Sequence, residues 1–178
     1  MVSGYFYPIV GGAEIQAKKQ ADVLIKLGHQ VDVLTCTVPN SKRYELLDGI
    51  NIYRQKGLFF GRFRVFTLIG LFIAFILKNR GKYDVIHVHQ ALWPALSCAL
   101  ASTLIKTPML VKLGSSGTLF DLNVFKNNSI FGSFLPNIIA KHTSYFVATT
   151  KTINSDLLRF GVNPKKIKNI PNGVFIDA

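Results

Sequence analysis

The chain has 178 residues, of which 49% are hydrophobic and 17% are charged. This length is enough for one domain with a core but too short for two full domains, and the composition excludes a disordered protein. The net charge of +12 calls for an anionic partner, either nucleic acid, an anionic membrane surface or a phosphorylated small molecule. Because no recognition helix, zinc finger or RNA-binding strand pair is present, no nucleic acid partner is expected.

A glycine pair, Gly11-Gly12, lies between a short first strand and a predicted helix over residues 13–27. The free N–H groups and the positive dipole end of that helix point at the loop, and glycines let a ligand approach the backbone closely. A phosphate or sugar hydroxyl could be held there, although a plain tight turn explains the same residues. Glu14, in the first helical turn, either caps the helix or contacts a substrate hydroxyl.

The next elements argue against a dehydrogenase. Strands are predicted over residues 31–35 and 50–53, with a loop over 39–48 between them. Asp32 lies inside its strand rather than at the end, where a ribose-binding acid is expected, and the glycine pair is no G-x-G-x-x-G fingerprint.

A helix predicted over residues 62–79 contains an apolar stretch from Val65 to Leu77, interrupted only by Thr67. About a dozen residues are too few to span a membrane, which needs about 20. The stretch is either a buried core helix or, with the preceding Phe59, Phe60, Arg62, Phe63 and Arg64, a basic-aromatic interfacial anchor. The two interpretations do not exclude each other.

The strand predicted over residues 84–89 carries two histidines. We expect His87 and His89 to point to opposite faces of the sheet, so that they cannot share a metal ion. His87, in mid-strand, is expected to be a core histidine with satisfied hydrogen bonds. His89 and the following Gln90 stand at the carboxyl end, where ligands bind in open α/β sheets, and are candidate substrate contacts.

A helix over residues 92–105 and a strand over 109–113 precede Gly114, Ser115 and Ser116. Small residues and hydroxyls after a strand suit a sugar or phosphate contact, with Lys112 adding charge; a flexible loop over 115–128 is the simpler alternative. Asp121 is a weaker candidate in the same loop. The sparse, scattered acids show no Ser-His-Asp order and no carboxylate pair for hydrolysis.

The remaining predicted elements are helices over 130–142 and 153–160 and strands over 145–148 and 167–170. Strands apolar on both faces alternate with helices, which predicts an α/β fold, a Rossmann-like, doubly wound and mainly parallel sheet. Cys36 and Cys98 lack metal-ligand spacing and are expected to be buried thiols. With no secretory signal after Met1, they indicate a cytoplasmic protein.

Both ends suggest a fragment. Only residues 1–3 precede the aromatic turn at residues 5–8, and a central strand so short would leave the middle of the sheet poorly paired. At the other end, Asn172 and Gly173 form a turn into something further, and we expect them to be an interdomain hinge.

Several motifs in order resemble the family 4 glycosyltransferases of GT-B fold. They are Phe6-Tyr7-Pro8 with Gly11-Gly12-Ala13-Glu14, then Leu27-Gly28-His29-Gln30-Val31, Tyr83-Asp84-Val85-Ile86-His87-Val88-His89, and Gly161-Val162 with Lys166-Ile167 and Ile170-Pro171-Asn172-Gly173-Val174. The resemblance covers nearly the whole chain. It implies the N-terminal half of a GT-B architecture, with residues 1–174 as the acceptor-side domain and 175–178 as the start of a linker to a C-terminal donor-binding domain.

The resemblance implies a retaining, metal-independent sugar transfer from a nucleotide-sugar donor, as co-substrate rather than cofactor, to a glycan or lipid-linked acceptor. Gly11 and Gly12 would face the donor diphosphate and the acceptor, with His89, Ser115 and Ser116 at the cleft edge. The family's fifth strand often ends in a histidine, but Leu113-Gly114-Ser115-Ser116 stands here, so no catalytic residue is assigned. The chain alone is expected to be inactive.

The alternative is a non-catalytic Rossmann-like module that docks with a separate donor-binding subunit. In either case the expected location is the cytoplasm, with peripheral attachment to the cytoplasmic membrane face motivated by the net charge of +12 and the apolar stretch.

Overall fold

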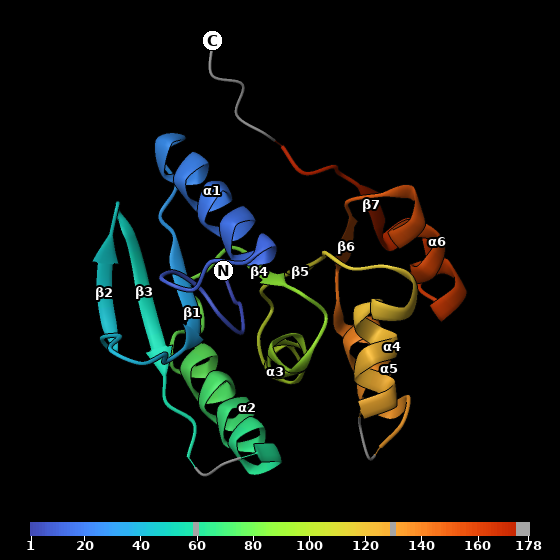
Figure 1. Ribbon diagram of the computed structural model, residues 1–178, viewed down its shortest axis with the longest axis horizontal. Helices are drawn as coiled ribbons and strands as arrows, with labels where there is room; N and C mark the ends of the chain where they lie inside the picture. The colour runs from blue at the N-terminus through green and yellow to red at the C-terminus, as the bar shows by residue number, and fades with distance from the viewer. Residues whose placement is uncertain (59–60, 129–130, 174–178) are drawn as a thin grey trace.

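The computed structural model describes residues 1–58, 61–128 and 131–173, with no side-chain description for Arg62. Its helices are α1 (Gly12–Lys26), α2 (Gly61–Lys78), α3 (Trp93–Ser102), α4 (Asp121–Asn128), α5 (Phe134–His142) and α6 (Lys151–Phe160), and its 3-10 turns are η1 (Gly117–Leu119) and η2 (Pro164–Lys166). Its strands are β1 (Asp32–Cys36), β2 (Tyr44–Leu47), β3 (Ile50–Gln55), β4 (Ile86–His89), β5 (Met109–Leu113), β6 (Tyr145–Ala148) and β7 (Ile167–Asn169). The predicted α/β fold is confirmed (Figure 1).

The strands form two groups, ordered β2-β3-β1 and β4-β5-β6-β7, in which every pair but β2–β3 is parallel. Val2 lies between the groups, bridging Leu34 of β1 and Val88 of β4 in parallel register. The Val2 N–H donates to the His87 carbonyl at 2.7 Å, and the Ser3 N–H donates to the Leu34 carbonyl at 3.1 Å on the other side. The expectation that so short a central strand would be poorly paired was therefore wrong. Successive backbone groups of one short strand can bond to the strands on its two sides.

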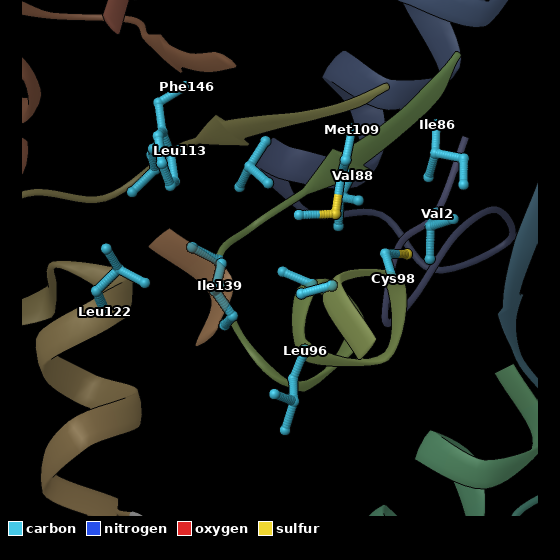
Figure 2. Close-up of a cluster of buried hydrophobic side chains, with 14 of the residues drawn as sticks. Val2, Ile86, Val88, Leu96, Cys98, Met109, Leu113, Leu122, Ile139 and Phe146 are labelled. Atoms are coloured by element: carbon cyan, nitrogen blue, oxygen red, sulfur yellow. The ribbon is translucent and has the colours of Figure 1, made fainter. Parts of the chain in front are cut away.

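Helices cover the two faces of the sheet unequally. On one face, α2, α3 and α5 pack over a large apolar core that includes Val2, Val88 and Phe146 (Figure 2). On the other face, Ala17 and Ala21 of α1 are fully buried against β1 and β3, which confirms the predicted inner face of that helix. The doubly wound arrangement places the loops after the parallel strands at one edge of the sheet.

The two predicted loops were wrong in part. Residues 39–48 contain β2, which pairs antiparallel with β3 through a turn in which Asp48 and Gly49 have positive φ values of 49° and 82°. The residues of β2 are exposed or half-buried, and no long apolar run marks this edge strand in the sequence. The sequence feature that indicates the hairpin is the Asp48-Gly49 pair at its turn. Residues 115–128 contain η1 and α4, elements too short to show a clear helical period.

The helix predicted from residue 130 begins at Phe134, and Ile130 lies outside the described residues. In α2, the side chains of Leu68, Phe72 and Ile76 are buried, so the core interpretation holds for its inner face. Three parts of the anchor predicted from the sequence lie outside the described residues: Phe59, Phe60 and the Arg62 side chain. Among the described helices, none combines the length and apolar character needed to cross a membrane.

Both cysteines are buried and unpaired, as predicted. Burial raises the pKa of the Cys36 thiol to about 11 and that of the Cys98 thiol to about 12. These thiols are packing groups of the core rather than nucleophiles.

Candidate functional site

The predicted site residues lie on loops that follow the carboxyl ends of parallel strands. Gly11 and Gly12 end the loop that follows the strand at Val2, Gln90 follows β4, and residues 114–116 follow β5. The segment at Val2, β4 and β5 are parallel to one another, so the loops that follow them lie at the same edge of the sheet. The structure therefore brings together most of the positions that the sequence singled out.

The glycine pair forms the start of α1. Gly11 is the N-cap in extended conformation, with φ −137° and ψ 172°, and its carbonyl accepts the Ile15 N–H at 2.9 Å. A Cβ added to Gly12 would meet nothing within 4 Å, and one added to Gly11 would meet only the carboxylate of Glu14. Nothing in the described protein fills the space beside Gly12, so a ligand could approach the backbone there closely.

Glu14 folds back over the start of its own helix, where its carboxylate lies beside Gly11. A carboxylate at this position is stabilised by the helix dipole. The side chain is half-buried, so it is still within reach of a ligand at the glycine pair. Both predicted roles of Glu14 stay open.

A buried arginine, which the sequence did not reveal, holds the loop before Gly11. The Arg54 side chain is 1% exposed, and its guanidinium donates to the Tyr7 carbonyl at 2.8 Å, the Lys42 carbonyl at 3.2 Å and Glu45 Oε2 at 2.7 Å. One planar group thus fixes the loop against the β2–β3 hairpin. Arg54 lies between Tyr53 and Gln55 in β3, a strand in which alternate residues are buried and most of these are apolar. The sequence pattern therefore does not reveal its role, which appears only from its hydrogen bonds in the structure.

The prediction that His87 and His89 face apart was wrong. Side chains two residues apart on a strand share a face, and the two rings stack with centroids 4.6 Å apart and planes 27° apart. The expectation that His87 has satisfied hydrogen bonds was also wrong. The Nε2 atoms of both rings are buried without a hydrogen-bond partner among the described residues. Burial lowers the pKa of His87 to about 4, and burial together with His87 and Lys112 lowers the pKa of His89 well below its ordinary value. Both rings are neutral at physiological pH.

Lys112 lies beside His89 in register on β5, on the same face of the sheet. Burial lowers the pKa of its ammonium group. This face therefore carries a cation next to two neutral imidazoles, a combination able to donate to phosphate or hydroxyl oxygens.

The turn after β4 has a strained residue and a buried carboxylate. Gln90 has φ of 71°, in the left-handed region, and its N–H donates to the Lys112 carbonyl at 2.9 Å. The next N–H, that of Ala91, donates to Asp121 Oδ2 at 2.8 Å. Asp121 is 4% exposed, and burial raises its pKa to about 6 although the Ala91 hydrogen bond opposes the rise. Asp121 thus positions the Gln90 turn rather than facing solvent.

The loop after β5 is fixed in a similar way. Ser115 and Ser116 are half-buried and Gly114 is exposed, and the Gly117 N–H that follows them donates to Asp156 Oδ2 of α6 at 2.8 Å. The backbone directly after the two serines is therefore anchored to α6. Asp156 was not singled out by the sequence, because nothing local links it to residue 117.

At the proposed hinge, Asn172 and Gly173 are exposed, and Val174 lies outside the described residues. The preceding Ile170 N–H still donates to the Ala148 carbonyl at 3.0 Å, so the segment leaves from the sheet edge. Gly173 lines a groove of about 390 Å³ together with Gln16 and Gln20 of α1, and with His87 and Lys112.

The structure also shows how the acidic and metal-binding residue types are arranged. Within residues 1–58, 61–128 and 131–173, no group of three or more His, Cys, Asp or Glu residues could hold a metal ion. Asp32 accepts hydrogen bonds from Lys82, Tyr83 and Asn51 at 2.6, 2.9 and 2.9 Å, which commits its carboxylate to structure at the amino end of β1. It is not placed to bind a ribose.

Comparison with known proteins gives a consistent result. The sequence matches the model of Glycosyltransferase Family 4 over residues 10–178. It is 30% identical over 181 residues to a subunit of phosphatidylinositol N-acetylglucosaminyltransferase from Arabidopsis thaliana, covering 98% of this chain and 39% of that protein. The Homo sapiens protein of the same name is 27% identical over 179 residues, with 98% and 36% covered. The chain thus spans about two fifths or less of the length of these two curated relatives.

Among solved structures, Anabaena HepE in complex with UDP and glucose aligns with a TM-score of 0.66 and 18% identity, covering 97% of this chain and 44% of that one. A sucrose-phosphate synthase structure from Thermosynechococcus elongatus aligns with a TM-score of 0.69 and 15% identity, covering 97% and 88%. At these identities the likeness shows the fold.

Proposed function

This chain belongs to glycosyltransferase family 4, and from that premise we propose that it is the acceptor-side domain of an enzyme that transfers a sugar from a nucleotide-sugar donor to a glycan or lipid-linked acceptor. The observation that supports this most is the family match over residues 10–178, which includes the glycine pair and every strand-end loop of the candidate site. The proposed transfer retains the anomeric configuration and needs no bound metal.

The proposed roles follow from the groups at the sheet edge. Backbone N–H groups at Gly12 and the dipole of α1 favour the negative charge that develops on a nucleoside diphosphate leaving group. Ser115 and Ser116, with Gln90, are suited to accept and donate hydrogen bonds to acceptor hydroxyls. Gly12 and Gly114 are exposed, and we propose that a donor-binding domain completes the site over them.

A lipid-linked acceptor is proposed from the named relatives, since the plant and human proteins each belong to a phosphatidylinositol N-acetylglucosaminyltransferase. The HepE structure holds UDP and glucose, which supports a UDP-sugar donor among the nucleotide sugars. Buried free thiols suit a reducing compartment, so the proposed location is the cytoplasm or the cytoplasmic face of a membrane.

The test is a transfer assay with the polypeptide joined to its donor-binding domain. We expect labelled sugar to pass from one of a panel of UDP- and GDP-sugars to a lipid extract, with undiminished rate in EDTA and with the donor's anomeric configuration retained by NMR. The chain of 178 residues alone is expected to transfer nothing. Inversion, loss of activity in EDTA, or turnover by the chain alone would each contradict the corresponding part of the proposal.

A further inference from the structure

A polar groove of about 590 Å³ is lined by residues of η1, α4, α5 and α6. The three helices lie together at one side of the molecule (Figure 1). The groove begins at Gly117 and Thr118 of η1, directly after Ser115 and Ser116. It therefore starts where the loop proposed to contact acceptor hydroxyls ends. Its volume falls in the range of about 300–1,000 Å³ that is typical of small-ligand pockets.

The wall of this groove carries polar side chains that the fold does not use. Asn123 and Lys126 are one turn apart on α4, so they share a face of that helix, and Asn137 lies one turn into α5. Ser133 is the N-cap of α5, yet its hydroxyl does not cap the helix. Within the part of the chain that the structure describes, neither these four side chains nor that of Thr118 makes a hydrogen bond or an ion pair. One exposed polar side chain needs no ligand, but five that line one groove can bind a single molecule together.

The groove is cationic. Lys126 and Arg159 each bring a positive charge to it. Asp156, which also lines it, is already used, because its Oδ2 accepts the Gly117 N–H at 2.8 Å. Arg159 Nη1 lies 3.6 Å from Asp156 Oδ1, too far for a hydrogen bond, and the Arg159 side chain is 79% exposed. Its guanidinium can therefore form paired hydrogen bonds with phosphate or carboxylate oxygens.

An aromatic side chain completes the wall. Phe160 lines the groove, and its ring packs edge-on against the buried Phe120, with centroids 6.3 Å apart and planes 61° apart. A ring held in this way offers an apolar surface to the C–H groups of a sugar. A lipid chain in the same groove would remove the amides and cations from water without giving them partners. The lining thus favours a sugar with an anionic group.

We propose that the groove between α4, α5 and α6 binds a sugar ring that carries a phosphate or a carboxylate. The cationic side chains of α4 and α6 bind the anion, and the amides of Asn123 and Asn137 bind ring hydroxyls. This rests on the proposed function in one respect: the sugar would be a distal part of the acceptor, whose reacting end lies at the loop after β5. The groove would then select acceptors by a group away from the reacting hydroxyl.

The test is an NMR titration of the isotope-labelled chain with four probes: glucose 6-phosphate, glucuronic acid, glucose and inorganic phosphate. We expect at least one charged sugar to bind about tenfold more tightly than glucose or inorganic phosphate, because only the charged sugars combine a ring with an anion. The signals that shift should include the Gly117 amide and the side-chain amides of Asn123 and Asn137. The stronger of the two charged sugars identifies the anion as phosphate or carboxylate. Inorganic phosphate that binds as tightly as either charged sugar, or no binding of either charged sugar, overturns the proposal.

Two variants separate the anion from the ring. Lys126→Gln should weaken binding of the charged sugar by about threefold and leave glucose unchanged, because it removes only a charge. Asn137→Ala should weaken binding of both by about fivefold, because it removes hydrogen bonds to hydroxyls. Both side chains are exposed, so folding should be unaffected, which circular dichroism checks.

The matched controls are Lys151→Gln and Asn127→Ala, at exposed positions of α6 and α4 that do not line the groove. Neither should change the affinity for any probe. A loss in these controls equal to that in Lys126→Gln and Asn137→Ala overturns the assignment of the site to this groove. The titration needs no sugar transfer, so its failure is distinct from failure of the proposed enzyme activity.

Discussion

At the scale of single residues, the candidate site is held by side chains that are remote from it in sequence. Asp121 accepts the Ala91 N–H, Asp156 accepts the Gly117 N–H, and Arg54 binds the carbonyl of Tyr7. Each places a charged group against the backbone of a loop that carries candidate contacts. Because these groups bind loop backbone, we propose that they are positioning residues rather than catalytic ones.

Asp121 should make stability depend on pH between about 4 and 6. Because burial raises its pKa from 3.8 to about 6, the folded chain keeps the proton over that range while the unfolded chain loses it. The contribution of Asp121 to the free energy of unfolding therefore falls as pH rises. The difference between its folded and unfolded pKa values makes this loss about 3 kcal/mol at neutral pH. Asp121→Asn keeps an acceptor for Ala91 but removes the titration.

The measurement is urea unfolding of the wild type and Asp121→Asn at several pH values. The variant's advantage in free energy of unfolding should grow from pH 4 to pH 7 and stay level above that. Asn123→Gln, a change at an exposed position of the same helix that adds no titratable group, is the control and should show no such growth. An advantage for Asp121→Asn that is independent of pH would show that Asp121 does not titrate in this way.

At this scale the sequence correctly placed most of the candidate residues at strand ends, because position at a strand end can be inferred from apolar patterning alone. It failed for His87 and His89, where the two-residue period of a strand puts both rings on one face and stacks them. It also could not find Arg54 or Asp156, which bind the candidate loops at Tyr7 and Gly117, 47 and 39 residues away. Contacts at such separations leave no local pattern.

At the scale of elements, the glycine loop and the β2–β3 hairpin form one unit through Arg54. Arg54→Lys keeps the charge but replaces a fork that reaches the Tyr7 and Lys42 carbonyls and Glu45 with a single ammonium. We expect a loss of about 2 kcal/mol in the free energy of unfolding, since buried acceptors lose partners. We also expect faster hydrogen exchange at the Ile9 amide, which bonds the Phe6 carbonyl in the loop.

Arg43→Lys is the control, because Arg43 is an exposed arginine directly before β2, the strand that pairs with the strand of Arg54. It should change neither quantity measurably. If Arg54→Lys unfolds in urea like the wild type and the Ile9 amide exchanges at the same rate, then Arg54 does not hold the loop.

The main helices and the buried strands followed from the sequence because each has a clear period or a run of β-branched residues. The edge strand β2 and the short helix α4 did not, for different reasons. The exposed and half-buried residues of β2 show no apolar run, and its stability comes from pairing with β3. The eight residues of α4 make too few turns to reveal a stripe, and packing on α5 supports them.

At the scale of the whole molecule, residues 1–4 join two strand groups into one sheet, so the loops that follow the parallel strands lie at one edge. Gly12 and Gly114 at that edge are exposed, and the chain spans 39% of the Arabidopsis relative and 36% of the human one. We propose that the remaining part of such a polypeptide closes this edge into a cleft. The donor domain would then approach from the side of Gly11 and Gly12.

The glycine pair provides the most direct test of this account. Gly12 is exposed, and a Cβ there meets nothing within 4 Å, so Gly12→Leu should fold with no loss of thermal stability, since leucine favours the helix. Gly70→Leu is the matched control, an exposed helical glycine on α2 that likewise has nothing within 4 Å.

The measurement is the rate of sugar transfer by the polypeptide that includes the donor-binding domain. Gly12→Leu should lower it by about 100-fold or more, because a side chain there keeps the substrate from the backbone N–H groups, and Gly70→Leu should not. A Gly12→Leu enzyme that transfers sugar at the wild-type rate would contradict the claim that the glycine pair faces the substrates.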